Sequence, residues 1–297
     1  MPARLILNAD DFGLTPGINR AIAELHSAGA LSGGRALTSA TLMANGAAFD
    51  DAVAVAHAHP TLGVGCHIVL TDGIPVSPPE TIPSLLGPDG RCFRPTLTGF
   101  LRALFLGRIR EQDITREASA QIEKLQRAGI QVTHIDSHKH THLFPAIVQP
   151  LLRVAEARGV CAIRNPFEPV WSLALNQGRP GRRIAIKLVG RLRPNFEASL
   201  QLHQGHIITT DGTMAISATG ILAAGTLGQI LQALPSDGTY ELCCHPGYND
   251  ADLDRVVTRL RVQRNLEREA LLNEVPALLR AANPPKLIHF GDLGKSG

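Results

Sequence analysis

Short apolar segments alternate with helix-like segments along most of this 297-residue chain. The expected strands lie at 4–9, 36–43, 63–70, 130–136, 160–164, 205–209, 239–244 and 286–290. The expected helices lie at 16–28, 46–58, 98–110, 114–128, 145–158, 217–233 and 251–271. Because strands that alternate with helices build parallel sheets, this order predicts an α/β fold, a distorted (β/α) barrel of seven or eight strands. A doubly wound open sheet is the alternative.

The alternation extends along the chain, and we expect one domain over residues 1–297. Residues 72–97 interrupt it with a stretch rich in Pro and Gly, which predicts a long substrate loop. Hydrophobic residues make up 44% of the chain and the net charge is only +3, which excludes a disordered protein. Aromatic residues make up only 4%, so we expect no nucleic-acid partner.

The sequence also predicts where the protein works. No apolar run reaches the roughly 18 residues of a membrane span, and the first residues do not resemble a signal peptide. The five cysteines are an odd number and are best interpreted as free thiols in a reducing compartment. We therefore expect a cytoplasmic protein. A homodimer is compatible with the sequence, which leaves the oligomeric state open.

Residues 179–193 predict a basic amphipathic insertion. Apolar residues there alternate with six basic ones: Arg179, Arg182, Arg183, Lys187, Arg191 and Arg193. Such a segment can lie on an anionic membrane surface, and residues 101–110 are a second candidate. The alternative is an ordinary helix face in water. On the first interpretation the protein contacts the inner membrane face peripherally.

Side chains that can do acid–base or metal chemistry follow the predicted strands. They lie near the carboxyl ends of five of them: Asn8, Asp10 and Asp11; His67; His134, Asp136, His138, His140 and His142; Arg164; Glu241 and His245. In barrels and open α/β sheets this edge carries the active site. The placement therefore predicts an active site at the carboxyl ends of the strands.

Two kinds of metal-ligating residue meet at this edge. One of the adjacent carboxylates Asp10 and Asp11 can bind a metal while the other acts as a base, although Asp also caps turns. Histidine is a common metal ligand, and the run from His134 to His142 predicts a metal site with His138 as the first choice and His142 as the rival. His67 is either a third ligand or a hydrogen-bonded core residue. An Asp with two His leaves a coordination position open, as in catalytic metal sites.

Two further residues have several interpretations. His245 comes just after a strand and before a Pro-Gly turn, where it can donate a proton to a leaving group or simply bond to the backbone. Arg164 can bind a substrate carbonyl or sugar hydroxyl, or pair with Glu168. The sequence does not separate these alternatives.

Four separated motifs together resemble the YdjC-like (ChbG-like) carbohydrate deacetylases. They are the runs 8–13 (NADDFG), 65–71 (GCHIVLT), 134–142 (HIDSHKHTH) and 241–247 (ELCCHPG). The resemblance implies a distorted barrel that removes N-acetyl groups from amino sugars with one divalent metal ion. It implies Asp11, His67 and His138 as metal ligands, Asp10 as general base and His245 as general acid. We expect Arg164, His142 and Glu241 to bind substrate.

Within this family the chain is most similar to the hopanoid-biosynthesis-associated deacetylase. Residues 66–73, 163–166 and 287–293 carry that similarity, while Cys66 departs from the apolar residue usual in the wider family. The similarity implies an N-acetylglucosaminyl hopanoid as substrate, with acetate and a free amine as products. The alternatives are a chitooligosaccharide deacetylase, a metal-dependent phosphoesterase and a non-catalytic metal-binding protein. Zn²⁺ is the preferred ion, with Mg²⁺, Mn²⁺ or Co²⁺ as alternatives.

Overall fold

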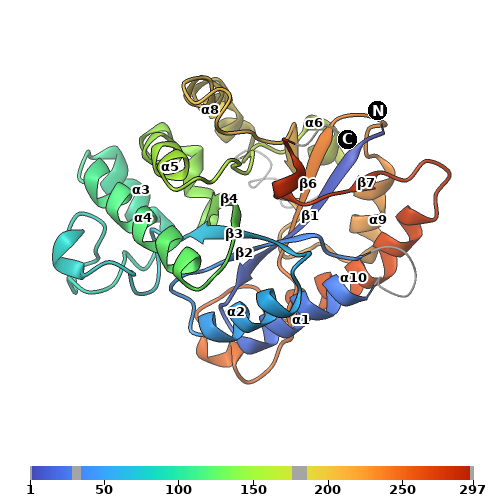
Figure 1. Ribbon diagram of the computed structural model, residues 1–297, viewed down its shortest axis with the longest axis horizontal. Coiled ribbons are helices and arrows are strands. Elements are labelled where there is room, and N and C mark those ends of the chain that lie inside the picture. Colours follow the sequence, from blue (N-terminus) through green and yellow to red (C-terminus); the bar gives the residue numbers. More distant parts are fainter. Residues whose placement is uncertain (1, 29–34, 176–185, 295–297) are drawn as a thin grey trace.

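A parallel sheet forms the centre of the computed structural model, which describes residues 2–28, 35–175 and 186–294 (Figure 1). Its seven strands run in the order β4-β3-β2-β1-β6-β5, and β7 pairs with β1. The strands are β1 (Arg4–Phe12), β2 (Ser39–Leu42), β3 (Gly63–Ile68), β4 (Val132–Ser137), β5 (Gly212–Met214), β6 (Thr239–Cys244) and β7 (Lys286–Leu287). β1 lies at the centre, where it pairs with β2, β6 and β7, and its side chains are therefore buried along nearly its whole length.

The sheet curls until its two edges approach each other. Beyond β4, the segment at 162–163 forms isolated parallel bridges with Ile135 on one side and Ile208 on the other. The chain then continues into β5, where the Thr213 amide donates to the Phe167 carbonyl while β5 pairs with β6. These bonds connect both edges, and the prediction of a distorted α/β barrel is confirmed.

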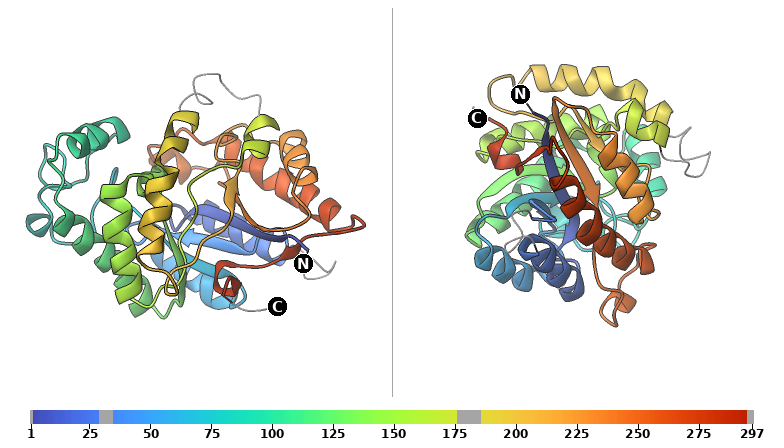
Figure 2. Two further views of the ribbon diagram at one scale, coloured as in Figure 1. Left: turned by 90° about the horizontal axis from the view of Figure 1, so that it is seen from above. Right: turned by 90° about the vertical axis from the view of Figure 1, so that its right-hand side faces the viewer.

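Helices cover the outside of the curled sheet (Figures 1 and 2). They are α1 (Pro16–Ser27), α2 (Phe49–Ala58), α3 (Leu97–Phe105), α4 (Glu111–Arg127), α5 (Pro145–Ala157), α6 (Val170–Leu175), α8 (Arg193–Gln201), α9 (Ala224–Gln232) and α10 (Val262–Leu279). The local sequence explains where α1 begins. Thr15 caps the helix by accepting from the Ile18 amide, and Pro16 occupies the first turn. The predicted end of this helix at Gly29 lies outside the described residues.

Five predicted elements in the second half of the chain were wrong in extent. Residues 160–164 form isolated bridges rather than a strand, and the strand predicted at 286–290 is confined to β7. Residues 205–209 contribute one bridge rather than a strand, and the strand forms at β5 instead. The helix predicted at 217–233 is confined to α9, since Gly220 before it has φ +82°, a left-handed conformation that does not continue a helix. The helix predicted at 251–271 begins only at Val262, after a short 3₁₀ turn at Leu253–Arg255.

The predicted loop at 72–97 is ordered by packing and projects to one side of the barrel (Figure 2). Its residues Leu85 and Phe93 are buried in the main core. Glu117 of α4 accepts from two of its backbone amides, those of Val76 and Ser77, at 2.9 Å each. The loop is therefore fixed to α4, and its role toward a substrate stays a prediction.

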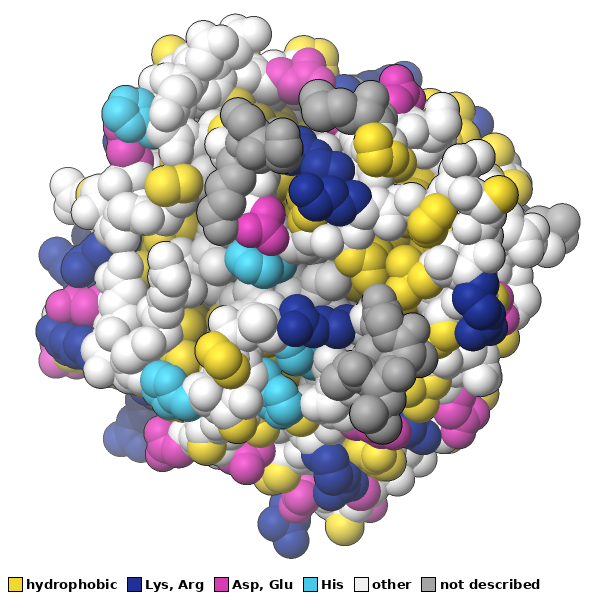
Figure 3. Space-filling model, turned by 45° about the vertical axis from the view of Figure 1, so that its right-hand side comes forward, with side chains coloured by type: hydrophobic (Ala, Val, Ile, Leu, Met, Phe, Trp, Pro, Cys, Tyr) yellow, Lys and Arg dark blue, Asp and Glu magenta, His cyan; other side chains and the backbone are white. Residues whose placement is uncertain are grey.

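The predicted basic insertion is described only from residue 186 onward, because 179–185 lie outside the described residues. Lys187 and Leu188 are exposed there, ahead of a 3₁₀ turn at Gly190–Leu192 that leads into α8. On the face shown in Figure 3, Lys and Arg side chains are interspersed with acidic and apolar ones. Among the described helices, none combines the length and the hydropathy that a bilayer crossing requires.

Candidate active site

Asp10 and Asp11 lie at the carboxyl end of β1, where the strand is irregular. The register of β1 against β2 shifts between Ala9 and Phe12, and Asp11 has φ +63°. A bulge of this kind redirects side chains that would otherwise alternate, and left-handed backbone at a non-glycine residue is common at functional sites. Both carboxylates are almost completely buried as a result.

Asp11, His67 and His138 lie together, with one ligand atom from each within 4.8 Å of the others. Oδ1 of Asp11 lies 3.7 Å from Nε2 of His67 and 3.6 Å from Nδ1 of His138. One carboxylate and two imidazoles are the donor set of catalytic zinc sites, so these three residues fit a divalent metal ion. The structure thus brings together the three residues expected to be ligands, while their role and the identity of the ion stay predictions.

Two charged neighbours orient these side chains. Oδ2 of Asp11 accepts from Nη2 of the buried Arg264 at 2.6 Å, which leaves Oδ1 facing the histidines. Nδ1 of His67 lies 2.7 Å from Oδ1 of Asp136, so Nε2 is directed toward Asp11. Burial opposes protonation of His67, but the carboxylates of Asp136, Asp10 and Asp11 together outweigh it and raise the pKa of His67 to about 9. A metal ion held at Nε2 would take the place of this proton.

The histidine run leaves β4 through a tight reversal. Lys139 and His140 both have left-handed backbone, with φ +57° and +53°. The reversal leaves His138 beside Asp11 and turns His142 into the interior, where its Nδ1 lies 2.6 Å from Oγ of Ser137. Of the two rival ligands, His138 is the one that the structure places at the cluster with Asp11. His142 is fully buried and has no exposed surface with which to make the predicted substrate contact.

Arg164 makes a bidentate contact with Asp10. Nη1 and Nη2 of Arg164 donate to Oδ2 and Oδ1 of Asp10 at 2.9 and 2.6 Å. Burial alone would raise the pKa of Asp10, but Arg164 and the nearby His67 hold it well below its usual range. Asp10 also forms a group with His67 and Asp136, and it therefore borders the Asp11 cluster.

Arg164 occupies the centre of three buried carboxylates. Besides Asp10, its guanidinium contacts Oδ2 of Asp136 at 2.5 Å and Oε1 of Glu241 at 2.6 Å. Burial raises the pKa of Glu241 to about 7 even though Arg164 opposes this shift. Neither Arg164 nor Glu241 has exposed surface, against the prediction that both bind substrate. Glu168, the other partner considered for Arg164, instead accepts from Ser172.

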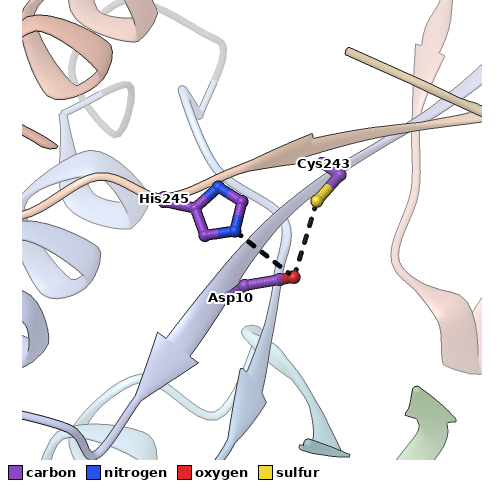
Figure 4. Close-up of side chains that lie close together, drawn as sticks. All are labelled: Asp10, Cys243 and His245. Atoms are coloured by element: carbon purple, nitrogen blue, oxygen red, sulfur yellow. Dashed lines mark hydrogen bonds and ion pairs between the residues drawn. The ribbon is translucent and has the colours of Figure 1, made fainter. Parts of the chain in front are cut away.

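His245 leaves the end of β6 and lies between two carboxylates. Its Nε2 is 3.8 Å from Oδ2 of Asp10, and its Nδ1 is 3.9 Å from Oε2 of Glu267. Its backbone amide donates to the same Glu267 oxygen at 2.5 Å. Figure 4 shows the ring directed toward Asp10 across the β1–β6 pair. The side chain is 12% exposed, so a small molecule can reach it.

For three residues of the site, the sequence predicted no role. Asp136 lies within the histidine run, and its place at a strand end was a usable signal. Arg264 and Glu267 are separated by three positions on α10, which places them on one helix face. Nothing in their local sequence marks them, since only the packing of α10 brings them to Asp11 and His245.

A curled parallel barrel with a carboxylate–histidine cluster at the carboxyl ends of its strands defines an α/β-barrel protein with a candidate metal centre. Comparison with known sequences identifies the family. Residues 4–280 match the model of the YdjC-like proteins. The chain therefore belongs to the YdjC-like family.

Curated relatives match over nearly the whole chain. A carbohydrate deacetylase of Brevibacillus brevis is 45% identical over 98% of this chain and 100% of its own length. A carbohydrate deacetylase of Geobacillus stearothermophilus is 34% identical over 85% of this chain and 83% of its own. A protein of Enterococcus faecalis V583 named for cellobiose-phosphate cleavage has a crystal structure with TM-score 0.78, 24% identity and 99% coverage of both chains. That likeness supports the fold.

Proposed function

We propose that this protein is a carbohydrate deacetylase that hydrolyses the N-acetyl amide of an amino sugar with one divalent metal ion. The observation that carries the proposal is the cluster of Asp11, His67 and His138 beside Asp10 and His245. The full-length similarity to proteins named carbohydrate deacetylase supports the substrate class. The bond that breaks is the amide C–N bond, and acetate and a free amine are released.

Asp11, His67 and His138 would hold the metal, with Zn²⁺ as the preferred ion and Mg²⁺, Mn²⁺ or Co²⁺ as alternatives. When bound, such an ion supplies Lewis acidity to a carbonyl oxygen and to water. Arg264 supports the same arrangement by restraining Oδ2 of Asp11. Asp136 contributes by fixing the orientation of the His67 ring, as carboxylate partners of ligating histidines commonly do.

Asp10 and His245 would move the protons. Arg164 and His67 keep Asp10 ionised, and in the proposed reaction its carboxylate accepts a proton as water attacks the acetyl carbon. His245 then donates a proton to the departing nitrogen. Nε2 of His245 lies 3.8 Å from Oδ2 of Asp10, so the two proposed proton carriers lie side by side.

The finer proposal is that the sugar is N-acetylglucosamine carried on a hopanoid lipid. The similarity of residues 66–73 to hopanoid-associated deacetylases supports it. So does a pocket of about 370 Å³ beside His140, with apolar walls that include Leu143, Phe167, Val170, Leu173 and Ile186. The exposed side chains of Phe105, Leu106 and Leu188 offer a peripheral contact with the cytoplasmic membrane face.

Acetate release from an N-acetylglucosaminyl hopanoid, with chitobiose as the soluble comparison, tests both levels of the proposal. Release from the lipid alone supports the hopanoid substrate, and release from chitobiose alone keeps the chemistry and rejects the lipid. A chelator should abolish the activity and added metal should restore it. If the metal-loaded protein releases acetate from neither compound, the deacetylase proposal fails and phosphoesters become the substrates to assay.

Two substitutions separate the proposed roles. D10N should lower turnover by about 10²–10⁴-fold while metal stays bound, as expected for loss of a general base. D11N should lose the metal itself. D50N, at an exposed position on α2, is the matched control and should change neither property. Near-normal turnover of D10N would contradict its assignment as the base.

A further inference from the structure

Cys243 is a nucleophilic side chain at this site that the proposed reaction does not use. It lies on β6 opposite Asn8 of β1, and its Sγ is 3.5 Å from Oδ2 of Asp10. The next residue, Cys244, points to the other face of the strand and donates to the Asn8 carbonyl at 3.2 Å. Of the two adjacent thiols, that of Cys243 faces Asp10 (Figure 4), whereas that of Cys244 bonds to the Asn8 carbonyl.

We propose that Asp10, Cys243 and His245 form a second metal site, which binds Zn²⁺ and other thiophilic divalent cations and inhibits the enzyme. A carboxylate oxygen, a thiol sulfur and an imidazole nitrogen lie within 4.8 Å of one another. Sγ of Cys243 and Nε2 of His245 both approach the same oxygen, Oδ2 of Asp10, at 3.5 and 3.8 Å. Mixed sulfur, nitrogen and oxygen donors favour Zn²⁺ over Mg²⁺, which prefers oxygen ligands alone.

This second site is weaker than the Asp11 cluster for two reasons. An incoming cation must compete with Arg164, whose Nη1 already donates to Oδ2 of Asp10 at 2.9 Å. The thiol of Cys243 must also lose its proton, and burial raises the pKa of Cys243. The Asp11 cluster therefore fills first. His245 is the most exposed of the three donors and provides the route of entry.

Inhibition follows from the identity of the ligands. A cation on this site removes the free carboxylate of Asp10 and the free imidazole nitrogen of His245, which are the proposed base and acid. This consequence rests on the proposed function. The binding itself does not, because it depends only on the three donors.

Cobalt titration of the metal-free protein tests the binding without any activity assay. The first equivalent of Co²⁺ should produce no thiolate-to-cobalt charge-transfer absorption, and a second, weaker equivalent should produce it. C243S should lose the second equivalent and its absorption, whereas C244S, at the neighbouring thiol, should keep both. If the serine substitution disturbs folding, C243A takes the place of C243S. Binding of one equivalent without thiolate absorption, or thiolate absorption with the first equivalent, would overturn the proposal.

Zinc inhibition of acetate release tests the consequence. Zn²⁺ above one equivalent should inhibit the wild type, and C243S should raise the half-inhibiting concentration by about tenfold or more, as loss of a metal ligand predicts. Excess Mg²⁺ should not inhibit. Basal activity of C243S with one equivalent should stay close to that of the wild type. A protein with the cobalt signature but no deacetylase activity would reject the proposed function and keep the metal site. Equal zinc inhibition of C243S and wild type would reject the inhibitory role.

Discussion

Replacing Arg164 with Met should destabilise the protein more than any surface substitution. R164M removes the cation that contacts Asp10, Asp136 and Glu241 while keeping a side chain of similar length. Removing one partner of a buried ion pair costs about 3–5 kcal/mol. Because Arg164 and the three carboxylates have almost no exposed surface, and one cation serves all three, we expect a loss in the upper part of that range at a pH where they are ionised.

The pH dependence of this loss identifies its cause. Without Arg164, burial raises the folded-state pKa of Glu241 further above its unfolded value, and stability is then lost as pH rises from the unfolded value through the folded one. Glu241, whose pKa is already about 7 in the wild type, should contribute most near neutral pH. R164M should therefore regain stability between pH 8 and pH 6, and adding E241Q to it should restore part of the loss at pH 8.

Urea unfolding at both pH values measures these differences in the free energy of unfolding. R20M is the control, since Arg20 makes an exposed pair with Asp250 at 3.4 Å that should be worth less than about 1 kcal/mol. If R164M does not fold at pH 8, the free energy of unfolding is measured instead for E241Q in the wild-type background. An R164M protein as stable as R20M at pH 8 would refute the claim that Arg164 neutralises three buried charges.

Two further predictions concern histidine partners. D136N removes the carboxylate that orients His67, so metal affinity should fall by about 10–100-fold in a calorimetric titration, and unchanged affinity would contradict the assigned contact. His26 is buried with its ring nitrogens near the Leu37 carbonyl and the Thr61 hydroxyl, and burial lowers its pKa to about 4. Since the unfolded chain binds that proton more readily, the free energy of unfolding should fall as pH drops from about 6.5 to 4. In urea unfolding, H26Q should flatten this pH dependence. An equal pH dependence in H26Q and the wild type would contradict the role assigned to His26.

Much of the site was predictable because chemistry-bearing residues lie at strand ends. Asp10, His67, His138 and His245 each lie within two residues of the carboxyl end of a strand that the hydrophobic pattern indicates. Parallel strands present their carboxyl ends at one edge, so the order of elements brings such residues together without further information. The predicted helix at 217–233 and the predicted strand at 205–209 were wrong in extent, because Gly220 and the short bridge at Ile208 interrupt the regular pattern.

The sequence by itself determined the α/β class, the edge of the sheet that carries the site and the residue types that meet there, because these follow from local periodicity and parallel topology. Tertiary structure decided which partners those residues have. The reversal at Lys139 placed His138 rather than His142 beside Asp11, and α10 brought Arg264 and Glu267 from far along the chain. Burial and long-range charge pairing depend on packing between distant segments, which no local pattern encodes.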